Sequence, residues 1–550
     1  MIRAHLCMVG IAVLAAADCS GLAVTPADAS VKPMNGDGTL KNGELLGEFL
    51  AVGSPGGYRV TARVAGIGAG SGNRYVALSV DRTPWRIVAV QSDVVAEYAF
   101  DCALTGPSHV VGVQALGDGK EEGPLLRVES VTVAPAAEGP EPGKSSVTAW
   151  NGDAEAREAA VLAQSADAIR VLRMSPAVVT VLDPKGKPAQ GAKVWIEQTN
   201  HAFLFGCNIC GWEQFGDRRL DDAYKERFAE LFNYATHPFY WMLYEPERGK
   251  PNYAYTDAVL SWCAARGIQA KGHPLLWANK AGVPPWSDGQ PPQGVQRRRV
   301  EDLMRRFAGR VGYWEVVNEP VNAPGLDIAG PHEWARAADP AAKLVINEYG
   351  IFYEGHPDFY RFLAHAVEQG IPFDVVGIQA HAPLHMAFPL DRVRALLDLY
   401  GGLGKQIHIT EFTPTSSGRK VLGAPWRDAW DEAQQAGYAE QFYRVCFAHP
   451  AVTAISWWDF CDVGAWAPGG GLLREDCTPK PAFERLRKLI REEWWTRIET
   501  NADAKGEVAF NGFQGAYRIR ARYAGNVGEA EFQVERQGEN RFVLHVTGNP

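Results

Sequence analysis

The sequence predicts an α/β protein built on a (β/α)8 TIM barrel, with a β-sandwich-like domain on each side of it. Between residues 200 and 490, short apolar segments alternate with helical patterns, which indicates parallel strands in βα units. Eight such strands can be counted, and eight is the number that closes this barrel. Several strands end in polar or aromatic residues, and active sites of such barrels lie at the carboxyl ends of the strands.

The strands and their last residues define one predicted mouth of the barrel. The predicted strands begin at Ala202, Phe239, Ile268, Tyr313, Lys343, Val375, Gln406 and Thr453. The polar and aromatic residues at their ends are His273–Trp277, Glu319, Glu348, His381, Glu411 and Trp458. Because all these ends point the same way in a parallel barrel, we expect their side chains to meet at one face.

The first 29 residues have the pattern of a signal peptide. Arg3 precedes an apolar run, Leu6–Ala17, which is too short to cross a bilayer comfortably. Small residues at Ala27–Ala29 offer a cleavage site. We therefore expect residues 1–29 to direct the protein to the periplasm or the outside of the cell.

The remaining units are predicted from changes in pattern along the chain. Residues 38–135 alternate apolar and polar residues between Gly-rich turns, which predicts a β-sandwich; it is either a carbohydrate-binding module or a spacer without a ligand. Residues 136–147 read as a linker rich in Pro, Gly and Glu. Residues 148–199 predict a helix and a β-hairpin packed on the main domain, and residues 491–550 predict a small C-terminal β domain.

The overall charge argues against a nucleic-acid partner. The 550 residues carry a formal net charge of −9, and no basic stretch is available to neutralise phosphates. After the first 29 residues, no segment reads as membrane-spanning, so we expect no membrane insertion. We also expect a monomer.

Two glutamates end predicted strands on opposite sides of the barrel. Glu319 ends the fourth strand and Glu411 the seventh. Hydrolysis of a glycosidic bond requires a proton for the leaving oxygen and stabilisation of an oxocarbenium-like carbon, and two carboxyl groups flanking the bond provide both. In retaining enzymes these groups lie about 5–5.5 Å apart and one of them attacks the sugar carbon. A single glutamate at a strand end is more often a solvated surface residue, but two that each end an apolar strand indicate this chemistry.

Six motifs stand at or near the predicted strand ends between about residues 200 and 490. These motifs are KGHPLLW (Lys271–Trp277), WEVVNE (Trp314–Glu319), INEYG (Ile346–Gly350), GIQAH (Gly377–His381), ITEF (Ile409–Phe412) and WDFCDVGAW (Trp458–Trp466). Together and in this order they resemble glycoside hydrolase family 10, the β-1,4-xylanases. The resemblance implies that Glu319 is the acid/base and that Glu411 is the nucleophile.

The same resemblance implies roles for the surrounding residues. His381 is expected to hydrogen-bond Glu411 and keep it ionised, and Asn318 to donate to the sugar 2-hydroxyl. The other residues expected to bind substrate are His273, Trp277, Gln379, Trp458 and Trp466. For His273 the alternative is a core histidine bonded to a backbone carbonyl. Neither the mechanism nor the motifs imply a metal or a redox cofactor.

The sequence departs from the family pattern on the glycone side of the predicted site. The segment Phe232–Gly249 lacks the Glu-Asn pair and the Lys that usually grip the glycone sugars, and it carries Tyr240 and Trp241 instead. Ala278 stands where a His usually follows the third-strand Trp. We therefore expect an intact catalytic pair with altered contacts to the glycone sugars.

The predicted function is that of a secreted, retaining endo-β-1,4-xylanase with a polysaccharide as its partner. One alternative is a retaining β-glycosidase that acts on another or a decorated plant β-glycan. The alternative from a different class is a non-catalytic glycan-binding barrel protein. Glu319 and Glu411 argue against that alternative, because a binding protein needs no such pair.

Overall fold

The computed structural model describes most of the chain. The described residues are 30–31, 39–41, 45–51, 56–67, 75–80, 83–90, 93–104, 108–116, 124–135, 154–354, 356–381, 387–419 and 429–547. The predicted signal peptide (1–29) and linker (136–147) lie outside them. Within the described residues, no helix is long and apolar enough to cross a membrane.

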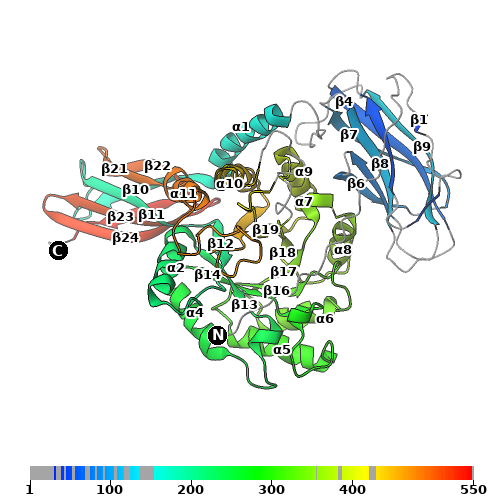
Figure 1. Ribbon diagram of the computed structural model, residues 1–550. Helices are drawn as coiled ribbons and strands as arrows, with labels where there is room; N and C mark the ends of the chain where they lie inside the picture. The colour runs from blue at the N-terminus through cyan, green and yellow to red at the C-terminus, as the bar shows by residue number, and fades with distance from the viewer. Residues whose placement is uncertain are drawn as a thin grey trace.

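The centre of the molecule is a closed parallel β-barrel, as the sequence predicts (Figure 1). Its strands are β12 (Leu204–Asn208), β13 (Tyr234–Pro238), β14 (Gln269–His273) with its short extension β15 (Leu276–Trp277), β16 (Tyr313–Asn318), β17 (Lys343–Glu348), β18 (Val375–Ile378), β19 (Gln406–Phe412) and β20 (Val452–Trp457). The last strand, β20, pairs with the first, β12, and β14 pairs with β16, so the ring has no open edge. The predicted (β/α)8 fold is confirmed.

The prediction for the second strand is wrong. The strand is Tyr234–Pro238, whereas Trp241–Tyr244 form the one-turn helix α3. Pro238, which lacks a backbone N–H, is the last residue of the strand. The aromatic run after it suggested a strand, but Trp241 is 1 % exposed and lies under the guanidinium of Arg299, 4.6 Å from its carbon. Packing against the Arg299 side chain therefore outweighs the β propensity of that run.

Helices surround the barrel, each with an apolar face on the strands. They are α2 (Arg218–Leu231), α4 (Tyr253–Ala264), α5 (Gln293–Arg306), α6 (Ala329–Ala338), α8 (Pro357–Glu368), α9 (Leu390–Gly401), α10 (Glu432–Phe447) and α11 (Pro481–Lys488). In α2, Asp217 caps the first turn by accepting from the backbone N–H of Arg219. Its buried residues Tyr224, Phe228 and Leu231 recur at the helical spacing of three to four. The helices thus hold the strands in register while the strand ends stay open at one mouth.

The C-terminal sandwich includes strands from before the barrel. It consists of β10 (Met174–Leu182) between β22 (Glu507–Phe513) and β25 (Arg541–His545), facing a sheet of β21 (Arg497–Asn501), β11 (Lys193–His201), β23 (Gly515–Tyr523) and β24 (Asn526–Val534). The expected hairpin of β10 with β11 is therefore wrong, because these strands belong to opposite sheets and pair with C-terminal strands. The helix before them, α1 (Ala154–Arg173), ends in Arg173, whose guanidinium donates to the carbonyls of Phe447, His449 and Val452 on the barrel.

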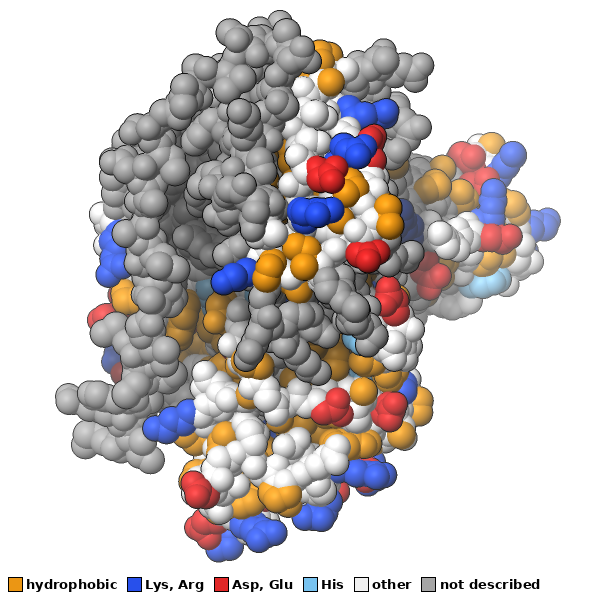
Figure 2. Space-filling model, turned by 90° about the vertical axis from the view of Figure 1, so that its right-hand side faces the viewer, with side chains coloured by type: hydrophobic (Ala, Val, Ile, Leu, Met, Phe, Trp, Pro, Cys, Tyr) orange, Lys and Arg blue, Asp and Glu red, His pale blue; other side chains and the backbone are white. Residues whose placement is uncertain are grey.

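The N-terminal strands form two further sheets. One contains β1 (Ser30–Val31), β2 (Thr39–Lys41), β4 (Gly56–Gly66), β7 (Ala96–Leu104) and β9 (Pro124–Pro135), and the other contains β3 (Leu45–Ala51), β5 (Tyr75–Val80), β6 (Thr83–Ala89) and β8 (Ser108–Leu116). Buried Val, Leu and Ala side chains fill the space between the sheets. Figure 2 shows this side of the molecule, where acidic and basic side chains of the described residues are interspersed. A carbohydrate-binding role for this sandwich stays a prediction.

We predict that a chain ending at Thr496 is destabilised, because β10 and β11 lose their partners. Val179, Val194 and Ile196 are 0 % exposed and would face water, and each such side chain costs roughly 1.5–3 kcal/mol. Thermal unfolding and binding of a hydrophobic dye measure the effect. A chain without residues 1–146 is the control and should retain the barrel's melting temperature. Equal melting temperatures for the chain ending at Thr496 and the full chain would contradict the shared sandwich.

Candidate active site

Glu319 lies directly after β16 at the mouth of the barrel. Its backbone φ is +54°, a left-handed value that is uncommon for a residue other than glycine. Trp277 Nε1 donates to Oε2 at 2.9 Å, and Gln379 Nε2 donates to Oε1 at 2.9 Å. Trp277 ends β15 and Gln379 follows β18, so elements on both sides orient this carboxyl group.

Burial raises the pKa of Glu319 from 4.5 to about 7. The negative charge of Glu411 acts in the same direction, while the hydrogen bonds from Gln379 and Trp277 oppose the shift without cancelling it. Near neutral pH this carboxyl group can therefore both hold and release a proton.

Glu411, in β19, has a different environment. Its side chain is buried, and His381 Nε2 lies 2.7 Å from Oε2 while Asn347 Nδ2 donates to Oε1 at 2.8 Å. The other ring nitrogen of His381 lies 2.9 Å from Thr413 Oγ1, which fixes the plane of the ring. The predicted contact between His381 and Glu411 is present, and each oxygen of Glu411 faces a nitrogen.

Asn347, in β17, connects the residues at the centre of the site, and the sequence analysis did not identify it as a site residue. Besides Glu411, its Nδ2 reaches Asn318 Oδ1 at 3.0 Å, and its Oδ1 accepts from Thr410 Oγ1 at 2.6 Å. Gly377 leaves room for it, since a Cβ there would lie 2.5 Å from Asn347 Oδ1. The signal available in the sequence was its place one residue before a strand end, within the motif INEYG.

A buried charged cluster forms the floor of the site. Glu315, in β16, is 0 % exposed and contacts both Lys271 Nζ and His273 Nδ1. Burial by itself would raise the pKa of Glu315, but the charges of His273 and Lys271 outweigh burial and lower it. His273 is therefore bound to a carboxylate beneath the site, rather than to the backbone carbonyl of the alternative interpretation.

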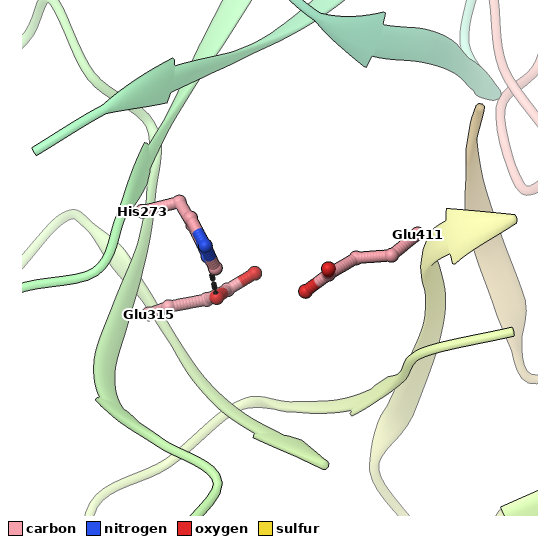
Figure 3. A group of neighbouring side chains, drawn as sticks. All are labelled: His273, Glu315 and Glu411. Carbon is pink, nitrogen blue, oxygen red and sulfur yellow. Dashed lines mark hydrogen bonds and ion pairs between the residues drawn. The ribbon is translucent and has the colours of Figure 1, made fainter. Parts of the chain in front are cut away.

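Figure 3 shows that His273 and Glu315 point from one side of the barrel toward Glu411 on the other. Ligand atoms of these three residues lie within 4.8 Å of one another, a spacing that a metal ion could bridge. The donor set fits a metal poorly, however. The ammonium of Lys271 already contacts Glu315, and His381 and Asn347 occupy the oxygens of Glu411. The group is explained as a hydrogen-bonded network.

Aromatic side chains line the mouth. Trp458 is 7 % exposed, with its ring centroid 5.3 Å from that of His273, and Trp466 is 49 % exposed, 4.3 Å from that of His381. Asp459 positions Trp466 by accepting its backbone N–H at 2.9 Å. Tyr240 lies 6.1 Å from the ring of Trp277. The structure therefore brings together Glu319, Glu411 and the seven residues expected to bind substrate, whereas Trp241, which was expected on the glycone side, lies in the core.

This fold and site define a class of protein. A (β/α)8 barrel with two glutamates at strand ends, close enough for their charges to interact but held in unlike surroundings, is the arrangement of barrel glycoside hydrolases. Residues 198–489, just over half of the chain, match the family described as Glycosyl hydrolase family 10. The chain belongs to this family, which confirms the predicted resemblance.

Individual relatives are distant and extend beyond the matched region. The anti-sigma-I factor RsgI6 of Acetivibrio thermocellus is 27 % identical over 377 residues, which cover 66 % of this chain and 47 % of that protein. Endo-1,4-beta-xylanase 2 of Arabidopsis thaliana is 27 % identical over 62 % of this chain and 31 % of its own. Endo-1,4-beta-xylanase B of Thermotoga neapolitana is 28 % identical over 50 % of this chain and 86 % of its own. The chain thus spans less than half of the first two proteins.

Solved structures also resemble the chain. Xylanase 10B from Thermotoga petrophila RKU-1, in complex with xylobiose, is 25 % identical, with a TM-score of 0.45 over 53 % of this chain and 95 % of that one.

We predict that Trp277→Phe raises the pKa of Glu319 above its value of about 7. The indole N–H stabilises the ionised carboxylate, and the phenyl ring has no such donor. A ¹³C NMR titration measures the shift, with Glu319→Gln used for assignment. Trp286→Phe is the matched control, since its indole donates to the carbonyl of Glu245. If the titration of Glu319 does not move in Trp277→Phe, the hydrogen bond does not tune this carboxyl group.

Proposed function

We propose that this protein is a retaining endo-β-1,4-xylanase that hydrolyses xylan by double displacement. The observation that carries the proposal is the contrast between two neighbouring carboxyl groups. Burial raises the pKa of Glu319 to about 7, whereas Glu411 is bound by His381 and Asn347. Unlike surroundings of this kind separate an acid from a nucleophile.

The proposed reaction uses the two groups in turn. Glu319 gives its proton to the leaving oxygen while Glu411 attacks the anomeric carbon and forms a glycosyl ester. The ester carries no negative charge, so the repulsion that helps to raise the pKa of Glu319 disappears. Glu319 then ionises more readily and takes a proton from the water that hydrolyses the ester.

The choice of xylan rests on the family and on relatives named endo-1,4-beta-xylanases. Another or a decorated β-glycan is the second candidate, because Tyr240 offers an aromatic ring on the altered glycone side. One relative is named an anti-sigma factor, so the non-catalytic alternative is tested as well. Product analysis on xylan, arabinoxylan, mixed-linkage glucan and cellulose distinguishes these candidates. Export by residues 1–29 and a monomeric state remain part of the proposal.

We predict that Glu411→Ala abolishes turnover of both polysaccharide and activated aryl glycosides, since both need the nucleophile. Glu319→Ala should lose the polysaccharide reaction but retain the first step with an aryl glycoside whose leaving group needs no proton. Burst kinetics on a dinitrophenyl glycoside measure that step. Equal losses on both substrates in Glu319→Ala would remove the acid assignment.

We predict that the first-formed sugar keeps the β configuration. Two displacements at the same carbon restore the original stereochemistry, provided that the carboxyl groups form the close pair of a retaining enzyme. Proton NMR of the earliest product resolves the two anomers before they equilibrate. An initial α-anomer would exclude the nucleophile role of Glu411.

We predict a weak preference between glycone sugars. Hydrogen bonds to sugar hydroxyls discriminate strongly because a wrong sugar leaves buried polar groups unpaired, whereas stacking discriminates weakly. Of the two aromatics expected here, Trp241 is in the core and Tyr240 lies at the mouth. The measurement is kcat/KM on aryl β-xylobioside against aryl β-cellobioside. A steep preference for xylobioside would show that other residues make the discriminating hydrogen bonds to the glycone sugar, and the prediction would be wrong.

A further inference from the structure

Glu348, the last residue of β17, is a buried carboxylate beside the predicted acid/base. Its side chain is 0 % exposed. Oε2 accepts the backbone N–H groups of Val321 at 3.0 Å and Asn322 at 3.1 Å. Oε1 accepts Asn322 Nδ2 at 2.8 Å and the backbone N–H of Tyr349 at 3.0 Å. Three of these four donors belong to the turn that begins two residues after Glu319.

That turn holds Glu319 in an unfavourable backbone conformation. A left-handed φ at a residue other than glycine persists only where its surroundings impose it. The backbone N–H of Glu319 donates to the carbonyl of Asn347 at 2.8 Å, and its own carbonyl accepts from Ala323 at 2.7 Å. The carboxylate of Glu348 binds the backbone N–H groups of Val321 and Asn322, which lie between Glu319 and Ala323 in the chain. It therefore stabilises the segment that follows Glu319.

The two carboxyl groups also interact through their charges. Burial raises the pKa of Glu348 to about 7, its backbone donors oppose the shift, and the charge of Glu319 adds to it. Repulsion between two carboxylates disfavours the charged form of each of them. Among the residues that the structure describes, the other titratable groups facing this region are Tyr349, Tyr400 and His356.

We propose that Glu348 is a positioning residue for Glu319. Its carboxylate fixes the turn Val321–Asn322, and through that turn it aims the carboxyl group of Glu319 at Trp277 and Gln379. This inference rests on the proposed acid/base role of Glu319. A residue that aims an acid matters for leaving groups that need a proton and is dispensable for those that do not.

Glu348→Gln tests the proposal with little change of shape. Each oxygen of Glu348 accepts two N–H groups, so either orientation of the amide sets an NH₂ against two donors. For aryl xylobiosides with poor leaving groups we expect kcat/KM to fall roughly a hundredfold, the effect of a displacement of about 1 Å. The glycosylation rate with a dinitrophenyl leaving group should be unchanged. Equal losses on both substrates would overturn the proposal.

Asp374→Asn is the matched control. Asp374 is also a carboxylate that accepts a backbone N–H, that of Leu344 at 2.9 Å, but it precedes β18 at the opposite end of the barrel. Any decrease of kcat/KM in Asp374→Asn should be the same for substrates with good and with poor leaving groups. If Glu348→Gln does not fold, Asn322→Ala removes the donor Nδ2 and leaves Glu348 in place. It should give the same dependence on the leaving group at smaller magnitude, and a loss without that dependence would overturn the proposal.

A second measurement is independent of turnover. In the Glu348→Gln protein, the further change Trp277→Phe should no longer raise the pKa of Glu319 in a ¹³C NMR titration, because the carboxyl group is no longer aimed at the indole N–H. A shift as large as the one that Trp277→Phe causes in the otherwise unchanged protein would overturn the proposal. If the unchanged protein hydrolysed neither aryl glycoside, the proposed function would fail, while this titration would still decide whether Glu348 controls Glu319.

Discussion

The structure depends on how buried negative charge is compensated inside the barrel. Glu315 and Glu411 are buried, and an uncompensated ion there would be strongly destabilising. Lys271 and His273 compensate Glu315, and His381 and Asn347 bind Glu411. Among the described residues, Glu319 receives two neutral donors and no direct cation. Burial therefore raises its pKa, and the negative charge of Glu411 adds to the shift, without a contacting cation to reverse it.

Barrel geometry explains why these groups can be arranged so closely. Glu315 lies inside the barrel three residues before Asn318, the strand end that precedes Glu319, and both side chains contact Nδ2 of Asn347. The neighbouring strand β17 adds Asn347, and β19 adds Glu411 from across the barrel, where Asn347 Nδ2 contacts both Glu315 and Glu411. Gly377 is the compensating feature in β18, because any side chain there would displace Asn347. Such a dense network needs one strand position without a side chain, and Gly377 provides that position.

Sequence reasoning succeeded where a local pattern determined the outcome. Strands such as β16 and β19 are short apolar runs with a polar end, and Glu319 and Glu411 follow from their place on those runs. It failed for β13, where the strand YATHP is less apolar than the aromatic turn after it, and pairing with β12 and β14 decides the outcome. It failed again for β10 and β11, whose partners lie about 300 residues later in the chain. The role of Asn347 depends on side chains from two other strands, which no single motif contains.

The division of the charges into layers also determines how the site can change during a reaction. The lower layer, Lys271 with Glu315 and His273, is an ion cluster in which a change of charge at one member would leave the others unpaired. The upper layer contains Glu319 and Glu348, whose pKa values burial raises to about 7. Glu319 lies next to Glu411, which loses its charge in the proposed mechanism when it forms the ester. Loss of the charge on Glu411 removes a repulsion that raises the pKa of Glu319, and it also reaches the lower layer through Asn347 Nδ2, which contacts both Glu411 and Glu315. Glu315 holds His273, whose ring contacts those of Tyr240 and Trp458, so in the proposed double displacement this cluster would keep the three rings in place during both steps.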